Sequence, residues 1–169
     1  MDDSITLQAN RSGQLWTADP GAWARLCTSS GCPVCDGPPL PEWILAETPI
    51  LWVTAQSEAP LPGYVCLACK RHVVEPYELS PQEQAEFWQD SMLAAQGLAN
   101  AVRPVKMNYE IHGNTIPHLH MHLFPRMRGD VYVGYMIHCR AQFTRSQEKL
   151  QEIGTSIRVC LAEHNRLVK

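Results

Sequence analysis

The sequence predicts an α+β fold, with a mostly antiparallel sheet, one long helix inserted between its strands and one helix appended near the C-terminus. The chain has 169 residues, about the length of one domain. Hydrophobic residues make up 45% and charged residues 18%, which supports a core and excludes disorder as the dominant state. Short apolar and β-branched runs bounded by turn residues predict strands, and two longer segments with apolar residues every three or four positions predict helices.

The N-terminal part of the chain contains little regular structure before the first strands. Residues 1–20 are polar and weakly patterned, and we expect an N-terminal arm there. A short helix is predicted at 21–26, and a cysteine segment rich in turn residues follows at 27–39. Three strands come next, with a loop rich in Pro and Gly before the last of them; they are predicted at 43–47, 50–54 and 64–69.

A long helix is predicted to begin at Ser80. This serine suits the N-cap, Pro81 suits the first turn, and Glu83 completes a capping box. Apolar residues then recur at helical spacing and predict one buried face, made of Trp88, Met92, Ala95, Leu98 and Val102.

Two further strands and a second helix complete the prediction. The strands are expected at 106–111 and 118–124. A second capping box at 144–147 leads into an amphipathic helix whose apolar positions are Leu150, Ile153, Ile157 and Cys160. We therefore divide the chain into the arm at 1–20, a main domain at 21–140, and a C-terminal helix at 141–169 that packs on or extends the domain.

Composition excludes several classes of protein. A net charge of -3 argues against nucleic acid as the main partner, because such proteins usually carry a basic face. No apolar stretch is long enough for a membrane helix, and Asp2 and Asp3 stand where a secretory signal would carry basic residues. We therefore expect a cytoplasmic protein, in which the seven cysteines are thiols or metal ligands rather than disulfides.

The most informative segment is a run of three histidines that alternate with apolar residues. Strand side chains alternate between faces, so His118, His120 and His122 are expected on one face and the apolar residues on the other. Three interpretations compete: a solvated strand face, a three-histidine metal site, or a nucleophilic histidine flanked by helpers. The third is favoured, because three imidazoles in a row reach too far for one tetrahedral ion, and a neutral imidazole is a usable nucleophile at pH 7.

The run His-Leu-His-Met-His-Leu-Phe at 118–124 resembles the signature of the histidine triad (HIT) superfamily of nucleotide hydrolases and transferases, in particular its zinc-containing bacterial type. The flanks match too: Leu-Pro-Gly-Tyr at 61–64 resembles the family's Pro-Gly-His, and Lys-Arg-His-Val at 70–73 resembles its Pro-Lys-Arg-His-Val. The resemblance covers about residues 32–126. It implies a five-stranded HIT-like fold, a nucleotide substrate and a homodimer formed by joining sheets.

The resemblance also implies roles for individual residues. His120 matches the nucleophile that attacks the α-phosphorus and forms a nucleotidyl-histidine intermediate, and His122 matches the helper that contacts phosphate and leaving group. Four residues match positions around the α-phosphate, namely Asn108, Gly113, Thr115 and Arg126. No chemistry is assigned to His112, His138 or His164. No Gly-rich phosphate loop ending in Gly-Lys-Ser/Thr is present, and neither a nicotinamide nor a flavin is expected.

Two Cys-x-x-Cys pairs offer metal or redox chemistry. Cys32 and Cys35 have the spacing for one zinc, and with Cys66 and Cys69 they could form a four-cysteine site or a redox pair. Cys66 and Cys69 lie three apart on a predicted strand and so face opposite sides, which favours core packing for them.

The resemblance implies another set of ligands, a structural zinc held by Cys32, Cys35, His72 and His118. Metal-free thiols, or Cys27 as a substitute ligand, are the alternatives to this set.

The function expected from these residues is hydrolysis at the α-phosphate of a dinucleoside polyphosphate or a nucleoside phosphoramidate. The alternatives are nucleotidyl transfer to another acceptor, a nucleotide-binding sensor or adaptor with little turnover, and a zinc or thiol redox module. The hydrolase hypothesis predicts that activity is lost with His120, whereas the redox hypothesis predicts that activity follows Cys32 and Cys35.

Overall fold

The computed structural model describes residues 19–37, 39–113, 115–137 and 140–168. The expected arm at 1–20 therefore lies almost wholly outside the described residues. The N-terminal elements are short helices: α3 (Pro20–Leu26), η2 (Ser29–Gly31), α4 (Pro33–Asp36) and η3 (Pro41–Trp43). The strands are β1 (Ile44–Glu47), β2 (Leu51–Thr54), β3 (Glu58–Ala59), β4 (Val65–Cys69), β5 (Lys106–Ile111), β6 (His120–Arg126) and β7 (Phe143–Thr144). The remaining helices are η4 (Pro76–Glu78), α5 (Pro81–Val102) and α6 (Gln147–Glu163).

The main sheet confirms the predicted fold class. Its five strands run in the order β1-β2-β4-β6-β5, and every neighbouring pair is antiparallel. The predicted strands match the observed ones to within one residue, except for the last of them, which was predicted at 118–124 and is observed as β6 at His120–Arg126. The two-residue strands β3 and β7 pair in a separate small sheet, and they are too short to show any alternation in the sequence.

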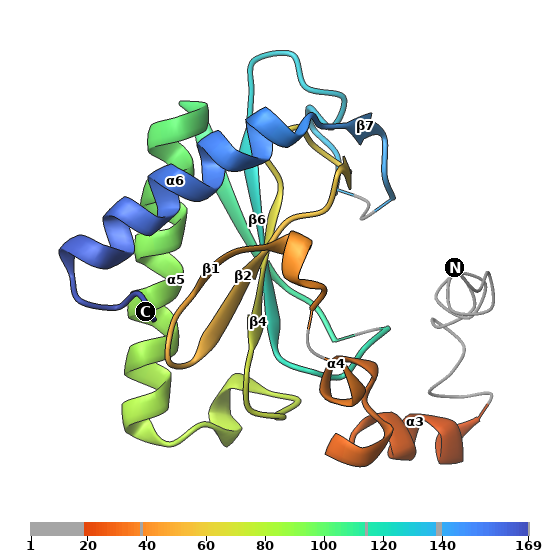
Figure 1. Cartoon of the computed structure of the whole chain (residues 1–169). Coiled ribbons are helices and arrows are strands. Elements are labelled where there is room, and N and C mark those ends of the chain that lie inside the picture. Colours follow the sequence, from red (N-terminus) through yellow and green to blue (C-terminus); the bar gives the residue numbers. More distant parts are fainter. Residues whose placement is uncertain (1–18, 38, 114, 138–139, 169) are drawn as a thin grey trace.

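The two faces of the main sheet have different neighbours. One face carries the apolar side chains of the core, and the helices α5 and α6 cover it (Figure 1). On β6 this core face is formed by Met121 and Leu123, and Leu119 joins the same cluster from the residue just before the strand. The opposite face carries His120 and His122, and the α3–α4 segment lies on that side of the sheet. The site is therefore built on the face that the long helices leave uncovered.

The start of α5 is as predicted, and Ala95 and Leu98 of the predicted buried face are buried, but two other positions of that face are not. The Ser80 hydroxyl accepts a hydrogen bond from the Glu83 amide, and the Glu83 carboxylate accepts one from the Ser80 amide. Trp88 and Met92, however, are 45% and 40% exposed. The reason is that α5 packs against α6 as well as the sheet, so its buried positions follow a different stripe: Phe87, Asp90, Ser91, Leu93, Ala94, Ala95, Gly97 and Leu98.

The C-terminal helix α6 buries the four predicted apolar positions, but it begins at a different cap. Ser146, not Thr144, is the N-cap, and its hydroxyl accepts a hydrogen bond from the Lys149 amide. Thr144 belongs instead to β7, where it pairs with Glu58. Within the described part of the chain, no helix has both the length and the apolar character needed to cross a bilayer.

The close approach of α5 and α6 leads to a stability prediction. A Cβ atom added at Gly97 would lie 2.6 Å from the Ile157 Cα atom and 2.8 Å from the Ser156 carbonyl oxygen. Gly97→Ala should therefore lower the free energy of unfolding by about 1–3 kcal/mol, although alanine is the better helix former. Urea denaturation measures this. The exposed neighbour gives the control, because Gln96→Ala should change stability by less than about 0.5 kcal/mol. A Gly97→Ala protein as stable as the wild type would contradict the packing described here.

Candidate functional site

A cavity of about 530 Å³ lies over the uncovered face of the sheet, within the usual size range for small-molecule sites. Its floor is made by neighbouring strands, with His120 and His122 from β6 beside Cys66 and Ala68 from β4. One wall comes from the N-terminal segment: Pro33, Val34, Gly37, Pro39, Leu40 and Trp43. The rest of the lining comes from β2, the residues that follow it, and two later segments: Thr54, Ala55, Gln56, Glu58, Pro60, Tyr64, Ile116 and Ala141.

The ring of His120 is held in one tautomer by the backbone. Its Nδ1 atom lies 2.6 Å from the carbonyl oxygen of His118. A carbonyl oxygen can only accept, so Nδ1 carries the proton and donates it. Burial lowers the pKa of His120, the hydrogen bond to the His118 carbonyl partly opposes this, and the nearby His112 adds to the lowering, so the neutral ring is favoured. In a neutral imidazole with a protonated Nδ1, Nε2 holds a lone pair.

His122 lies next to His120 and is more completely buried. Their ring centroids are 4.8 Å apart, and the His122 ring stacks on Phe124 at 5.6 Å. Burial, followed by repulsion from His120 and His112, lowers the pKa of His122 to about 3. The imidazole is therefore neutral near pH 7. Its Nδ1 atom lies 2.7 Å from the phenol oxygen of Tyr64.

The edge strand β5 brings a second polar pair to this face. Glu110 stands opposite His122 in the β5–β6 register. The His112 Nε2 atom lies 3.0 Å from the Glu110 carboxylate, and the His112 and His122 ring centroids are 5.3 Å apart. Sequence reasoning assigned no role to these two residues. The signal that could have found Glu110 is its register with His122, which depends on the strand pairing.

The four residues expected around the α-phosphate occupy different places. Asn108 stands opposite Phe124 in the register, on the same face as His122. Arg126 makes two hydrogen bonds to the carboxylate of Asp130, at 2.7 and 2.8 Å. Gly113 and Thr115 lie in the connection between β5 and β6. Among the described residues that line the cavity, none of these four occurs, so their contact with phosphate stays a prediction.

A buried arginine holds together segments that line the cavity, and the sequence analysis did not predict this role. Arg145 is 6% exposed, and its guanidinium donates to the carbonyl oxygens of Gln56, Pro62 and Tyr64. Burial lowers the pKa of Arg145 to about 10, which still leaves the group charged at pH 7. Its hydrogen bonds join the residues after β7 to the loop between β2 and β4, which contributes Gln56, Pro60 and Tyr64 to the cavity lining.

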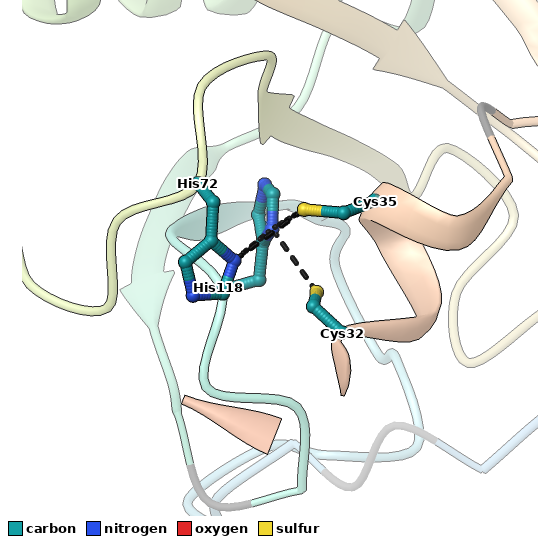
Figure 2. A group of neighbouring side chains, drawn as sticks. All are labelled: Cys32, Cys35, His72 and His118. Atoms are coloured by element: carbon teal, nitrogen blue, oxygen red, sulfur yellow. Dashed lines mark hydrogen bonds between the residues drawn. The ribbon is translucent and has the colours of Figure 1, made fainter. Parts of the chain in front are cut away.

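Four side chains converge beside the cavity. They are the four residues that the resemblance implied as zinc ligands. Cys32 and Cys35 come from the start of α4, His72 follows β4, and His118 precedes β6 (Figure 2). Their ligand atoms all lie within 4.8 Å of one another. The His118 Nδ1 atom lies 3.3 Å from the Cys32 sulfur and 3.6 Å from the Cys35 sulfur. The Nδ1 atoms of His72 and His118 are 3.3 Å apart.

The chemistry of these four atoms fits a tetrahedral metal ion. Zn–N bonds of about 2.0–2.1 Å and Zn–S bonds of about 2.3 Å separate ligand atoms by roughly 3.3–3.8 Å, which agrees with the contacts above. The Nε2 atoms of His118 and His72 donate to the carbonyl oxygens of Cys69 and Cys27, at 2.6 and 3.0 Å. Both Nδ1 atoms therefore turn lone pairs toward the centre of the cluster. Without a metal, the thiols of Cys32 and Cys35 can donate hydrogen bonds to these lone pairs, and a bound cation would displace the thiol protons.

The two cysteines of β4 face opposite sides of the sheet, as strand alternation predicts. Cys69 packs in the core as predicted, but the core-packing prediction is wrong for Cys66, which lies on the opposite face and lines the cavity. Cys27 contributes its backbone carbonyl to His72 rather than its sulfur to the cluster. In the described part of the chain, the group that could hold a metal ion thus consists of two cysteines and two histidines.

Comparisons with known proteins agree with this geometry. The sequence profile of one family, the HIT domain, matches residues 39–129. A histidine triad protein from Marinobacter aquaeolei is 23% identical, with a TM-score of 0.61, over 71% of this chain and 88% of that one. A Zn-bound histidine triad family protein from Mycobacterium smegmatis is 19% identical, with a TM-score of 0.55, over 82% and 98%. A diadenosine triphosphate hydrolase from Plasmodium falciparum is 18% identical, with a TM-score of 0.50, over 73% and 79%.

Proposed function

The chain belongs to the HIT domain family, and on that premise we propose that it hydrolyses a nucleotide at the α-phosphorus through a covalent nucleotidyl-histidine intermediate. The observation that carries the proposal is the hydrogen bond from His120 Nδ1 to the His118 carbonyl. It leaves the lone pair on Nε2 of a histidine that lines a cavity of ligand size. Dinucleoside polyphosphates and nucleoside phosphoramidates are the proposed substrates. The hydrolase from Plasmodium falciparum, which shares the fold, supports a substrate of this kind.

The proposed reaction has two displacements. In the first, His120 Nε2 attacks the α-phosphorus, a P–N bond forms, and the leaving group departs. In the second, water attacks the same phosphorus and releases the nucleotide and His120. His122, Asn108, Gly113, Thr115 and Arg126 are proposed to donate hydrogen bonds to the phosphate or the leaving group, because donors fixed around phosphoryl oxygens stabilise the transition state.

Replacing the nucleophile tests this mechanism. The wild type mixed with diadenosine tetraphosphate, or with adenosine phosphoramidate, should release AMP and show a transient gain of one AMP group by intact mass. His120→Ala should lose the adduct and at least about 1000-fold in kcat, because no other group replaces the nucleophile. His164→Ala, at an exposed helix end, is the matched control and should keep full activity.

Other outcomes select the alternatives. Binding without adduct or AMP in the wild type would contradict the hydrolase and favour a sensor. An adduct that is released by a second nucleotide or a sugar phosphate, but not by water, would favour a nucleotidyltransferase.

We also propose that Cys32, Cys35, His72 and His118 bind one structural zinc ion. Support comes from the contact distances, the donor set, and the Zn-bound relative from Mycobacterium smegmatis. All four positions would be filled by protein, so the ion holds the wall of the cavity rather than reacting with substrate. The reducing cytoplasm, where we expect this protein, would keep the two thiols available.

Metal analysis tests the zinc proposal. Purified protein should contain about one zinc per chain, and Cys32→Ser should lose it and lower the melting temperature by about 5–10 °C, because structural zinc contributes directly to folding free energy. Cys66→Ser is the matched control and should keep the zinc, because Cys66 lies on the cavity floor outside the cluster. Loss of the zinc when Cys66 and Cys69 are replaced together would show a four-cysteine site instead.

A homodimer formed through the edge strand β5 is a third part of the proposal. β5 is the last strand of the sheet, and it exposes Tyr109 and Ile111. An exposed apolar edge strand is a surface that proteins usually cover. Sedimentation should therefore give a dimer for the wild type and a monomer for Ile111→Asp. Val159→Asp, on the exposed side of α6, should remain a dimer. A wild-type monomer at micromolar concentration would refute this interface.

A further inference from the structure

The proposed reaction needs a proton for its leaving group, and His122 is the group placed to deliver it. Burial and two neighbouring imidazoles keep His122 neutral near pH 7. A neutral imidazole that gives up its Nε2 proton becomes an anion unless its Nδ1 atom receives another proton in the same event. Proton transfer by His122 therefore requires a second group that donates a proton to its Nδ1 atom.

The structure places a phenol there. Tyr64 lines the cavity beside His122, and its Oη atom lies 2.7 Å from His122 Nδ1. The ring is fixed by stacking, with centroids 5.8 Å from His122 and 5.0 Å from Phe124. Tyr64 occupies the position that follows Pro62 and Gly63, where the family motif quoted above has histidine. A tyrosine at this point can donate to an imidazole nitrogen or accept from it.

A buried positive charge lies near Tyr64 and can act on its phenol oxygen. The buried Arg145 guanidinium donates to the Tyr64 backbone carbonyl, and its described hydrogen bonds all go to carbonyl oxygens. Its positive charge is therefore not neutralised by a carboxylate in those bonds, and it interacts electrostatically with the Tyr64 phenol. Because Arg145 is buried, water screens its charge less than it would at the surface.

We propose that Tyr64 is a positioning residue that sets the tautomer of His122 and supplies the leaving-group proton through it. The inference rests on the proposed hydrolase function and deepens it. The two neighbouring imidazoles are less suited to this role. His120 is the proposed nucleophile, and the His112 ring lies tilted at a centroid distance of 5.3 Å from His122 while its Nε2 atom is engaged with Glu110.

The relay balances over the first displacement. His120 Nε2 forms the P–N bond, and the bond from phosphorus to the leaving oxygen or nitrogen breaks. That leaving atom takes the proton from His122 Nε2, and His122 Nδ1 takes the proton from the Tyr64 hydroxyl. His122 stays neutral throughout, and the negative charge that the leaving group would have carried comes to rest on the Tyr64 oxygen, within electrostatic range of Arg145.

During the second displacement, the same groups transfer protons in the opposite direction. His122 now carries its proton on Nδ1, so Nε2 has a lone pair and accepts a proton from the attacking water. The His122 Nδ1 proton returns to the Tyr64 oxygen as the P–N bond to His120 breaks. Each turnover thus restores the starting tautomer, with no external acid or base.

The test compares leaving groups of different basicity. The p-nitrophenyl and phenyl esters of AMP are the probes, because p-nitrophenolate departs readily without a proton and phenolate does not. Tyr64→Phe keeps the ring but removes the hydroxyl. We expect about a 100-fold lower kcat on the phenyl ester, less than about threefold on the p-nitrophenyl ester, and KM values within about twofold of wild type. Tyr135→Phe, at a tyrosine that is 78% exposed, is the control and should match wild type on both esters.

A second variant separates chemistry from folding. Tyr64→His supplies another group that can pass a proton, and it should recover most of the loss on the phenyl ester. Equal losses on both esters in Tyr64→Phe, or a Tyr64→His protein no better than Tyr64→Phe at the same melting temperature, would overturn the relay while leaving the hydrolase function standing. Turnover of neither ester by the wild type would overturn the proposed function and the relay with it.

Discussion

The alternation of side chains along β6 is the constraint on which the rest of this molecule depends. Met121 and Leu123 belong to the core beneath α5 and α6, and they hold the strand against a packed interior. Because the side chains of a strand alternate, His120 and His122 must then face the other way, toward the cavity. A shift of one residue in register would bury the imidazoles and expose the apolar side chains, so core packing itself fixes the histidine face.

His118 joins the metal cluster to the strand that carries the other two histidines. Its ring points Nδ1 toward Cys32 and Cys35, and its own carbonyl oxygen accepts the hydrogen bond from His120 Nδ1. One residue thus takes part in both the cluster and the orientation of the neighbouring imidazole. This double use also explains why β6 begins two residues later than the alternation suggests, since the ring of His118 is committed to the cluster and its amide bonds locally to Ile116.

Local sequence patterns accounted for the strands of the main sheet, the capping box at Ser80, and the four residues of the metal cluster. Each depends on spacing along the chain or on motifs that a family shares. The contacts that were missed depend on distant segments. The Tyr64–His122 bond joins residues 58 positions apart, and Arg145 reaches back 89 positions to Gln56. The prediction that Trp88 is buried was wrong for a related reason. Helical periodicity shows that α5 has a buried face, but not that packing against α6 widens that face and rotates it around the helix.

The wall of the cavity is attached to the rest of the fold differently from its floor. The floor is hydrogen-bonded sheet, continuous with the core. The wall begins beside Cys32 and Cys35 of the cluster, and it straddles the start of the segment that matches the HIT domain profile at residue 39. Substitutions in this wall change the outline of the cavity without disturbing the strands beneath it. A change in this wall therefore alters which ligands fit against it while the imidazoles on the floor keep their arrangement, so the shape of the cavity and the chemistry of its floor depend on different parts of the chain.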